Sequence, residues 1–299
     1  MHSSAEIHPF FDEATHTVTY LVADPSTRQA AVIDPVLDYD HRSGKVATTS
    51  ADQVLSVARE NGLQIVWILE THAHADHLSA APHLKLHTGA QIAIGEHIRA
   101  VQTIFRPMFQ MNDSANHPST PDSAPESSSG FDRLLRDGET LAIGHLAVEV
   151  LHTPGHTPAC VSYRIDDAVF VGDTLFMPDY GTARADFPGG SAQTLYQSIQ
   201  RLLALPPATR LFMCHDYKAP GRDHYAWESS VAEERARNIH VHEGVSAQEF
   251  VAMRQRRDAT LPAPTLLLPS IQVNIEAGRL PAAQANGVRY LKIPLSMPT

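Results

Sequence analysis

The chain of 299 residues carries 33 acidic and 23 basic side chains, which gives a net charge of −10 with histidine neutral. This balance excludes nucleic acid as a main partner, because a phosphate backbone requires a basic face. No run approaches the ~18 apolar residues of a membrane span. The first basic residue is Arg28, so we expect no secretory or transit signal at this N-terminus, no membrane contact and a cytoplasmic location.

Apolar runs alternate with helical patterns in the first hundred residues. Strands are predicted over residues 20–23, 30–36, 64–70 and 91–94. Helices are predicted over 51–61, with Ser50 and Gln53 as a capping box, over 79–86, with Ser79 as the cap, and over 96–109. Residues 112–129 are rich in Ser and Pro and nearly free of apolar side chains, which predicts a flexible surface loop.

The second half continues the alternation. Strands are predicted over residues 139–143, 146–151, 160–165, 168–172 and 210–214. Helices are predicted over 191–205, over 228–238 and, from a capping box of Ser246 and Glu249, through Arg257. Strands interleaved with helices indicate sheets covered by helices, hence a layered α/β sandwich.

A dense set of metal-binding side chains follows the strand over 64–70. Residues 71–77 read THAHADH, with three His and one Asp within six residues. Side chains alternate along an extended segment, so His72, His74 and Asp76 can point to one side, and His77 begins the following turn. Imidazole and carboxylate suit zinc, iron, manganese or nickel. A plain polar loop with capping residues is the alternative, and so dense a set of ligand types argues against it.

Three later segments repeat this arrangement. An apolar run stops and then delivers His156, Asp173 or His215. Ligands at successive strand ends form one rim of a sheet, where their side chains converge. Together with the first segment they make seven candidate ligands.

The order of these residues resembles that of the metallo-β-lactamase superfamily, with HxHxDH at 72–77 followed by His156, Asp173 and His215. The resemblance implies a four-layer αββα sandwich with the metal site at one sheet edge. It places the catalytic domain over residues 1–240 and a helical and strand extension, packed on the same domain, over 241–299.

A narrower resemblance is to the persulfide dioxygenases, also called sulfur dioxygenases, and to their bacterial β-lactamase-like-hydrolase branch. It rests on THAHADHLSAAPHLK at 71–85, GDTLFMPDYGTARADFPGG at 172–190 and CHDYKAPGRD at 214–223. It implies oxidation of glutathione persulfide by O2 to sulfite and glutathione, a sulfide detoxification. It also implies a homodimer.

The same resemblance implies one Fe(II) per chain, held by His72, His156 and Asp173. Two His and one carboxylate leave open positions on iron for the substrate sulfur and O2. Four further residues would orient these ligands or hold a second metal: His74, Asp76, His77 and His215.

Residues for substrate handling are implied around these ligands. Tyr217 matches a tyrosine beside the iron, while Arg184, near Asp186, matches a position that organises substrate or site; Asp216 joins this orienting set. We expect Lys218 and Arg222 to face the glutathione carboxylates, with two solvated surface cations as the equal alternative.

Two other functions remain open. A binuclear zinc hydrolase of thioesters such as hydroxyacylglutathione, or of lactones, would use all seven ligands and a metal-activated water. A non-catalytic, metal-stabilised binding protein is the third possibility. In each case Cys160 and Cys214 are expected to be buried, reduced thiols without a catalytic role.

Overall fold

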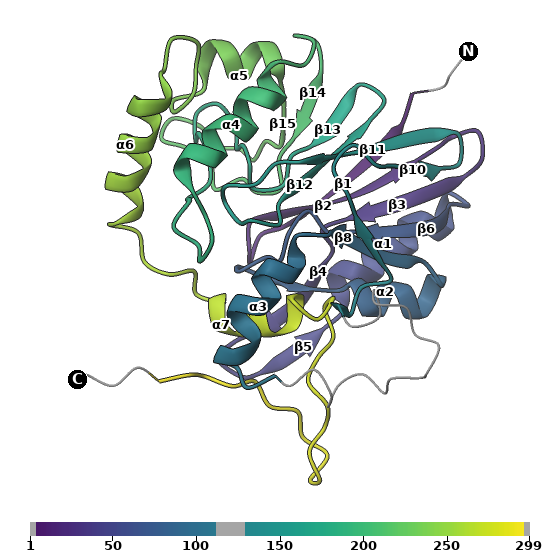
Figure 1. The fold of residues 1–299 in the computed structure, drawn as a ribbon. Coiled ribbons are helices and arrows are strands. Elements are labelled where there is room, and N and C mark those ends of the chain that lie inside the picture. Colours follow the sequence, from purple (N-terminus) through teal and green to yellow (C-terminus); the bar gives the residue numbers. More distant parts are fainter. Residues whose placement is uncertain (1–3, 112–128, 296–299) are drawn as a thin grey trace.

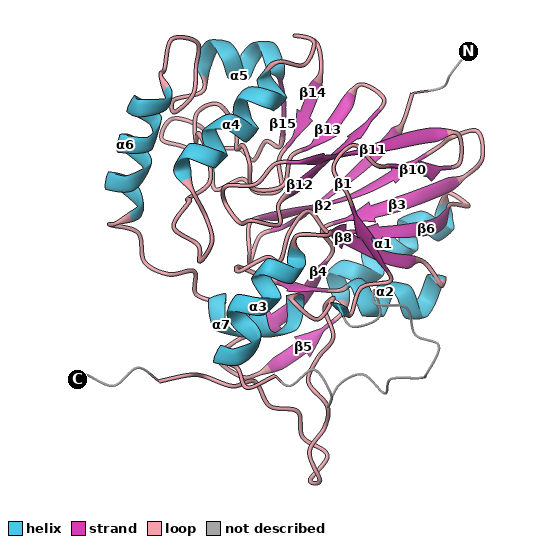
Figure 2. Cartoon of the chain, in the orientation of Figure 1, coloured by secondary structure: helices cyan, strands magenta, loops and turns pink. Residues whose placement is uncertain are grey.

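The computed structural model describes residues 4–111 and 129–295. The predicted loop over 112–129 lies outside the described residues apart from Ser129. Two six-stranded sheets face each other (Figures 1 and 2). The first contains, in spatial order, β1 (Glu6–Asp12), β2 (Thr17–Ala23), β3 (Gln29–Ile33), β6 (Gln64–Leu69), β8 (Gln91–Gly95) and β9 (Arg133–Leu135). The second contains β10 (Thr140–Ile143), β11 (Leu146–His152), β12 (Val161–Ile165), β13 (Ala168–Phe170), β14 (Arg210–Phe212) and β15 (Glu228–Ser230).

Strand β2 shows how the sequence produces the layers. Its side chains are all buried, but they alternate between two cores. Tyr20 and Val22 pack between the sheets, against residues such as Tyr163 and Phe170 of the second sheet. Leu21 belongs to the outer core beneath the helices. A strand buried on both faces reads as a continuous apolar run, as this one does.

Helices cover the outer face of each sheet. α1 (Thr49–Glu60), α2 (Ala81–Thr88), α3 (Ile98–Met108) and α7 (Leu267–Asn274) pack on the first sheet. α4 (Ala192–Leu203), α5 (Val231–Arg237) and α6 (Ala247–Asp258) pack on the second. The predicted αββα sandwich is therefore confirmed. No helix in the described ranges has the length and apolar content that crossing a bilayer requires.

Two predicted helix starts are wrong, and one is confirmed. α1 begins at Thr49, and the Ser50 hydroxyl donates to Asp38 at 2.7 Å instead of capping the helix. Ser79 lies in β7 (Leu78–Ser79), and Ala80 is the N-cap of α2. Ser50 instead binds a side chain that is distant in the sequence, and Ser79 is part of a strand. Ser246 and Glu249 do form the predicted capping box of α6.

Further elements were not predicted. Residues 228–230 form edge strand β15 before α5, not the start of a helix. β4 (Val36–Asp40) and β5 (Lys45–Ala47) form a hairpin, and β4 pairs with β7 in a small third sheet. After residue 240, α6 packs on α4, and α7 packs on β7 and α3.

Candidate metal centre

The seven predicted ligands meet at one edge of the sandwich, because each follows a strand that ends there. The segment 72–77 follows β6, His156 follows β11, Asp173 follows β13 and His215 follows β14. These strands belong to both sheets, so the ligands face one another across the gap between the sheets. All but Asp76 are buried.

The first donor group consists of His72, His156 and Asp173, whose ligand atoms lie within 4.8 Å of one another. The Asp173 Oδ2 atom lies 3.8 Å from His72 Nε2 and 3.6 Å from His156 Nε2. The far side of each ring is held in place: His72 Nδ1 lies 3.0 Å from the Thr71 hydroxyl, and His156 Nδ1 donates to the Arg184 carbonyl at 2.8 Å. These contacts aim both Nε2 atoms at Asp173, as outer partners of metal-bound histidines do.

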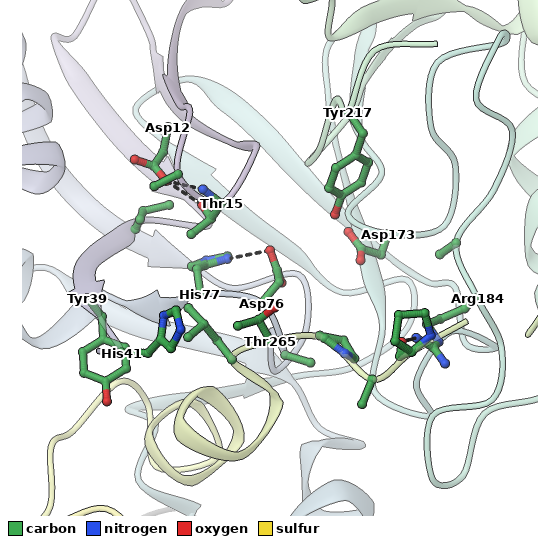
Figure 3. A pocket seen from close by; sticks show the side chains of 18 of the residues that line it. Asp12, Thr15, Tyr39, His41, Asp76, His77, Asp173, Arg184, Tyr217 and Thr265 are labelled. Carbon is green, nitrogen blue, oxygen red and sulfur yellow. Dashed lines mark hydrogen bonds and ion pairs between the residues drawn. The ribbon is translucent and has the colours of Figure 1, made fainter. Parts of the chain in front are cut away.

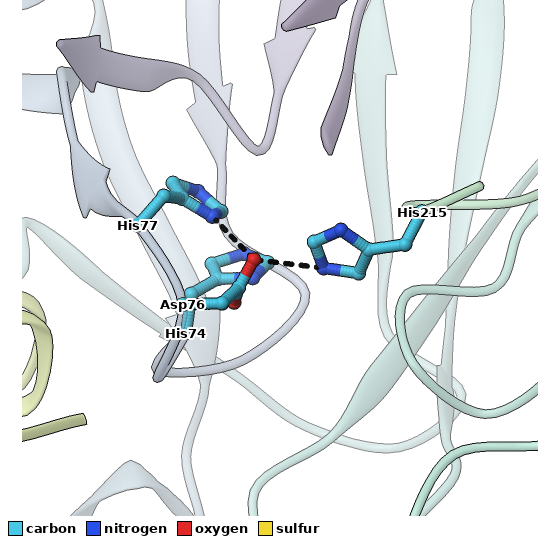
Figure 4. A group of neighbouring side chains, drawn as sticks. All are labelled: His74, Asp76, His77 and His215. Atoms are coloured by element: carbon cyan, nitrogen blue, oxygen red, sulfur yellow. Dashed lines mark hydrogen bonds and ion pairs between the residues drawn. The ribbon is translucent and has the colours of Figure 1, made fainter. Parts of the chain in front are cut away.

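The second donor group consists of His74, Asp76, His77 and His215 (Figure 4). Its members already contact one another, since Asp76 Oδ2 lies 3.4 Å from His77 Nδ1 and 3.3 Å from His215 Nε2. His215 also connects the two groups, because its Nε2 lies 3.3 Å from Asp173 Oδ1.

His74 has a partner on its other side that sequence reasoning missed. Its Nε2 lies 3.0 Å from Asp34 Oδ1 and 3.7 Å from Glu70 Oε2, and all three side chains are buried. Burial alone would lower the pKa of His74, but the carboxylates of Asp34 and Glu70 raise it to about 9. Asp34 also ends an apolar strand, β3, and that strand-end position was the available sequence signal.

The donor atoms fit a metal ion. Among the described residues, His72 Nε2, His77 Nε2, His215 Nε2 and Asp173 Oδ1 are buried without a hydrogen-bond partner. Leaving such atoms unpaired is costly, and buried polar groups are nearly always satisfied. A cation bound by these atoms would satisfy them. Burial lowers the pKa of His72 far below its usual value, so this ring is neutral and able to bind a metal.

The profile of the Metallo-beta-lactamase superfamily matches residues 13–215, which include all seven ligands. The chain belongs to the metallo-β-lactamase superfamily. Its fold is therefore that of this superfamily.

Relatives within the superfamily carry different names. The chain is 53% identical to a probable metallo-hydrolase of Burkholderia pseudomallei, over 97% of this chain and 98% of that protein. It is 46% identical to Glyoxylase B2 of Dictyostelium discoideum, over 99% of each. It is 28% identical to the human mitochondrial persulfide dioxygenase ETHE1, over 91% of this chain and 88% of that one. Among solved structures, ETHE1 of Myxococcus xanthus superposes with a TM-score of 0.70 at 32% identity, over 92% of this chain and all of that one.

A pocket of about 1060 Å³ opens in front of the donors (Figure 3). His77, His156 and Asp173 lie in its wall together with Tyr217. The Tyr217 hydroxyl points toward Asp173 in Figure 3, and the ring stacks on His215 with centroids 5.6 Å apart. Tyr217 is 37% exposed, but desolvation within the pocket and the carboxylates of Asp76 and Asp173 raise its pKa well above the usual value, so the hydroxyl keeps its proton.

Arg184 and Asp186 serve the site through contacts within the protein. The Arg184 guanidinium forms a two-point ion pair with Asp186, at 2.5 and 2.7 Å, and donates to the Pro262 carbonyl at 2.7 Å. Its own carbonyl accepts the hydrogen bond from His156. The role of this pair, as the contacts show it, is to hold the segment that orients a ligand.

Asp216, Lys218 and Arg222 follow His215 and contact groups of their own loop and of its surroundings. Arg222 binds Asp216 at 2.6 Å twice and Asp179 at 2.6 and 3.1 Å, so its donors are occupied. Lys218 lies over the Tyr225 ring at 4.3 Å. None of the three lies in the wall of the pocket. These contacts favour a role in shaping the loop after His215 over direct contact with substrate.

The 71–77 loop is held from behind by a residue of α7. The Asn274 amide donates to the carbonyls of His74 and His77 at 2.8 and 2.7 Å, and its oxygen accepts from the Ser79 backbone at 2.8 Å. Nothing in the local sequence around Asn274 marks it as part of a metal site.

The segment 181–186 is held by residues between α5 and the end of α6. The backbone N–H of Thr182 donates to His240 Nδ1 at 3.0 Å, and Asn238 donates to the Gly181 carbonyl at 3.0 Å. Asp258, paired with Arg254, accepts from the Ala185 backbone at 2.9 Å. His240, which the sequence left without a function, thus supports the carbonyl that orients His156.

The two cysteines are free and buried, as expected. Burial raises the pKa of Cys160 to about 12, and burial together with Asp34 also raises the pKa of Cys214. Neither thiol is available as a thiolate near neutral pH.

Proposed function

We propose that the protein is a mononuclear Fe(II) persulfide dioxygenase that oxidises glutathione persulfide. The overall reaction joins GSSH, O2 and H2O to give GSH, SO3²⁻ and two H⁺. The S–S bond breaks, the outer sulfur is oxidised to sulfite, and O2 is reduced. Bound iron supplies the redox chemistry that activates O2, which zinc lacks.

The observation that carries the proposal is the separation of His72, His156 and Asp173 from His74. The first three form a two-histidine, one-carboxylate group by themselves. His74 instead lies against Asp34 and is grouped with Asp76, His77 and His215. The first group thus offers three protein donors, which would leave positions open on a bound iron for the persulfide sulfur and O2. The likeness to proteins named ETHE1 supports the same assignment.

The remaining residues then have definite tasks. Thr71 and the Arg184 carbonyl keep His72 and His156 aimed at the metal position. Tyr217, protonated at neutral pH, can donate a hydrogen bond to a sulfur or oxygen atom in front of Asp173. The apolar side chains of Phe176 and Leu261 in the pocket wall help to exclude water from the reacting sulfur.

The test is elemental analysis of protein purified without oxygen, followed by O2 uptake and sulfite formation with glutathione persulfide. We expect about one iron per chain and one O2 consumed per sulfite formed. Protein that holds iron but consumes no O2 with this substrate would overturn the proposal.

A binuclear zinc hydrolase of glutathione thioesters is the second candidate. The intact second group of His74, Asp76, His77 and His215 favours it, as do the names of the relatives at 53% and 46% identity. Two zinc ions would polarise the thioester carbonyl and activate a water. Two zincs per chain with thioester turnover would decide for this function.

A further inference from the structure

One wall of the pocket is built by the β4–β5 hairpin, whose strand β4 pairs with β7 directly after His77. Residues 36–42 and 45–47 line the pocket, and the hairpin carries the exposed cations Arg42 and Lys45 at its tip. Its turn is held in place by Asp40, which accepts from the Arg42 backbone at 3.0 Å and from Ser43 at 2.5 Å. The hairpin base is held by Ser50, which donates to Asp38. The two cations are thus presented by a fixed structure.

A third cation reaches the same pocket from α6. Arg257 lines the pocket and is exposed. Two neighbouring arginines, Arg184 and Arg254, also line it, but each is paired with an aspartate. Within the part of the chain that the structure describes, Arg42, Lys45 and Arg257 form no ion pair. We call these three residues the cationic rim.

The rim matters because the protein as a whole repels anions. With a net charge of −10, binding of an anionic substrate depends on local positive charge at the pocket. A tripeptide thiol carries its carboxylates at its two ends, far from the sulfur. The pocket of about 1060 Å³ is slightly larger than the roughly 300–1,000 Å³ that is usual for ligand sites. Its wall includes the cationic rim and four of the candidate ligands, Asp76, His77, His156 and Asp173.

We propose that the cationic rim binds the carboxylates of the glutathione moiety, with Arg42 and Lys45 on the hairpin at one end and Arg257 on α6 at the other. Asp38 and Asp40 on the same hairpin supply a counter-charge for the ammonium group of the γ-glutamyl end. In this proposal the carboxylates are bound by the rim and not by Lys218 and Arg222, which lie outside the pocket wall. The inference rests on the proposed function only for its choice of glutathione, and a glutathione thioester would use the same rim.

The experiment measures binding without turnover. Isothermal titration calorimetry of anaerobic, metal-loaded protein compares glutathione with glutathione diethyl ester, whose carboxylates are neutralised. We expect wild-type protein to prefer glutathione, and R42A/K45A and R257A each to lose about 3- to 10-fold in glutathione affinity, because exposed and partly desolvated charge contacts are of this size. Affinity for the diethyl ester should change less than about 2-fold, since the ester lacks the charges that the rim contacts.

The matched control is R136A, which removes one cation that is 79% exposed and lies outside this pocket. It should bind glutathione like wild-type protein. Three results would each overturn the proposal that the rim binds carboxylates. They are unchanged glutathione affinity in both rim variants, equal losses of affinity for glutathione and its ester, and a wild-type protein that does not prefer glutathione over the ester. Oxygen uptake assayed in parallel tests the proposed function separately. If glutathione binding depends on the rim but no O2 is consumed, the role of the rim is supported and the dioxygenase function is contradicted.

Discussion

The two segments that carry the metal ligands are supported in different ways. The 71–77 loop is held by Asn274, whose neutral amide bonds two carbonyls and one backbone N–H. The 181–186 segment, which orients His156, is held by the titratable side chains of His240, Asp258 and, through Asn238, Glu234. Both supports lie far along the chain from the ligands. The first support is a neutral amide, whereas the second includes the carboxyl of Glu234, whose pKa burial raises to about 7.

The largest effect is expected from removing a ligand of the first donor group, with a residue of the second group as the comparison. H156A should lose iron affinity on the order of 100-fold or more, because a direct ligand contributes at least as much as an outer partner. H77A should keep close to one iron per chain, because His77 belongs to the second group. Elemental analysis and O2 uptake measure both. Equal loss of iron in H77A would show that the two groups act as one site.

The support of the 71–77 loop is tested with N274A. The substitution leaves three buried backbone groups unpaired, so we expect the free energy of unfolding to fall by about 2–4 kcal/mol and metal affinity to fall about 10- to 100-fold.

Gln272 is the matched control on the same helix. It is also buried, and it bonds Leu268 and Lys292 rather than the ligand loop. Q272A should lower the free energy of unfolding and leave metal affinity unchanged. Denaturant unfolding and metal competition measure the two quantities. A similar metal affinity in N274A and Q272A would remove Asn274 from the metal centre.

A smaller effect is expected at His240. H240A removes the acceptor for the Thr182 N–H and loosens the Arg184 carbonyl that His156 contacts, so metal affinity should fall about 10-fold. H240N provides an amide oxygen as acceptor and should restore most of that affinity. Failure of H240N to exceed H240A in metal competition would indicate that the ring acts by packing alone.

The smallest effect is expected from the pH dependence of Glu234. This carboxyl is fully buried, and burial raises its pKa to about 7. The folded state therefore binds the proton more tightly than the unfolded state, and the free energy of unfolding falls as pH rises from about 4.5 to 7. E234Q should be more stable than wild type by about 1–3 kcal/mol at pH 8 and similar to it at pH 4.

Thermal unfolding at both pH values measures this difference. N274A serves as the comparison, because its loss of stability should be the same at pH 4 and pH 8. A pH-independent effect of E234Q would contradict the contrast between the two supports.

The sandwich and the candidate ligands could both be predicted from the sequence, because both depend on local patterns. The buried strand β2 and the strands before 71–77, His156, Asp173 and His215 are apolar runs, which can be recognised from neighbouring residues alone. Ligands at strand ends then converge because the strands end at one edge. The capping box of Ser246 is local in the same sense, and it was predicted correctly.

Only the tertiary structure showed which ring nitrogen of each histidine faces the other donors and which residues hold the histidines in place. His74 turns toward Asp34, and Asn274 reaches His74 across 200 positions of the chain. Ser50 does not cap α1, because in the folded protein its hydroxyl donates to Asp38. A polar side chain bonds whichever partner packing places beside it, and the periodicity of a sequence carries no record of that partner.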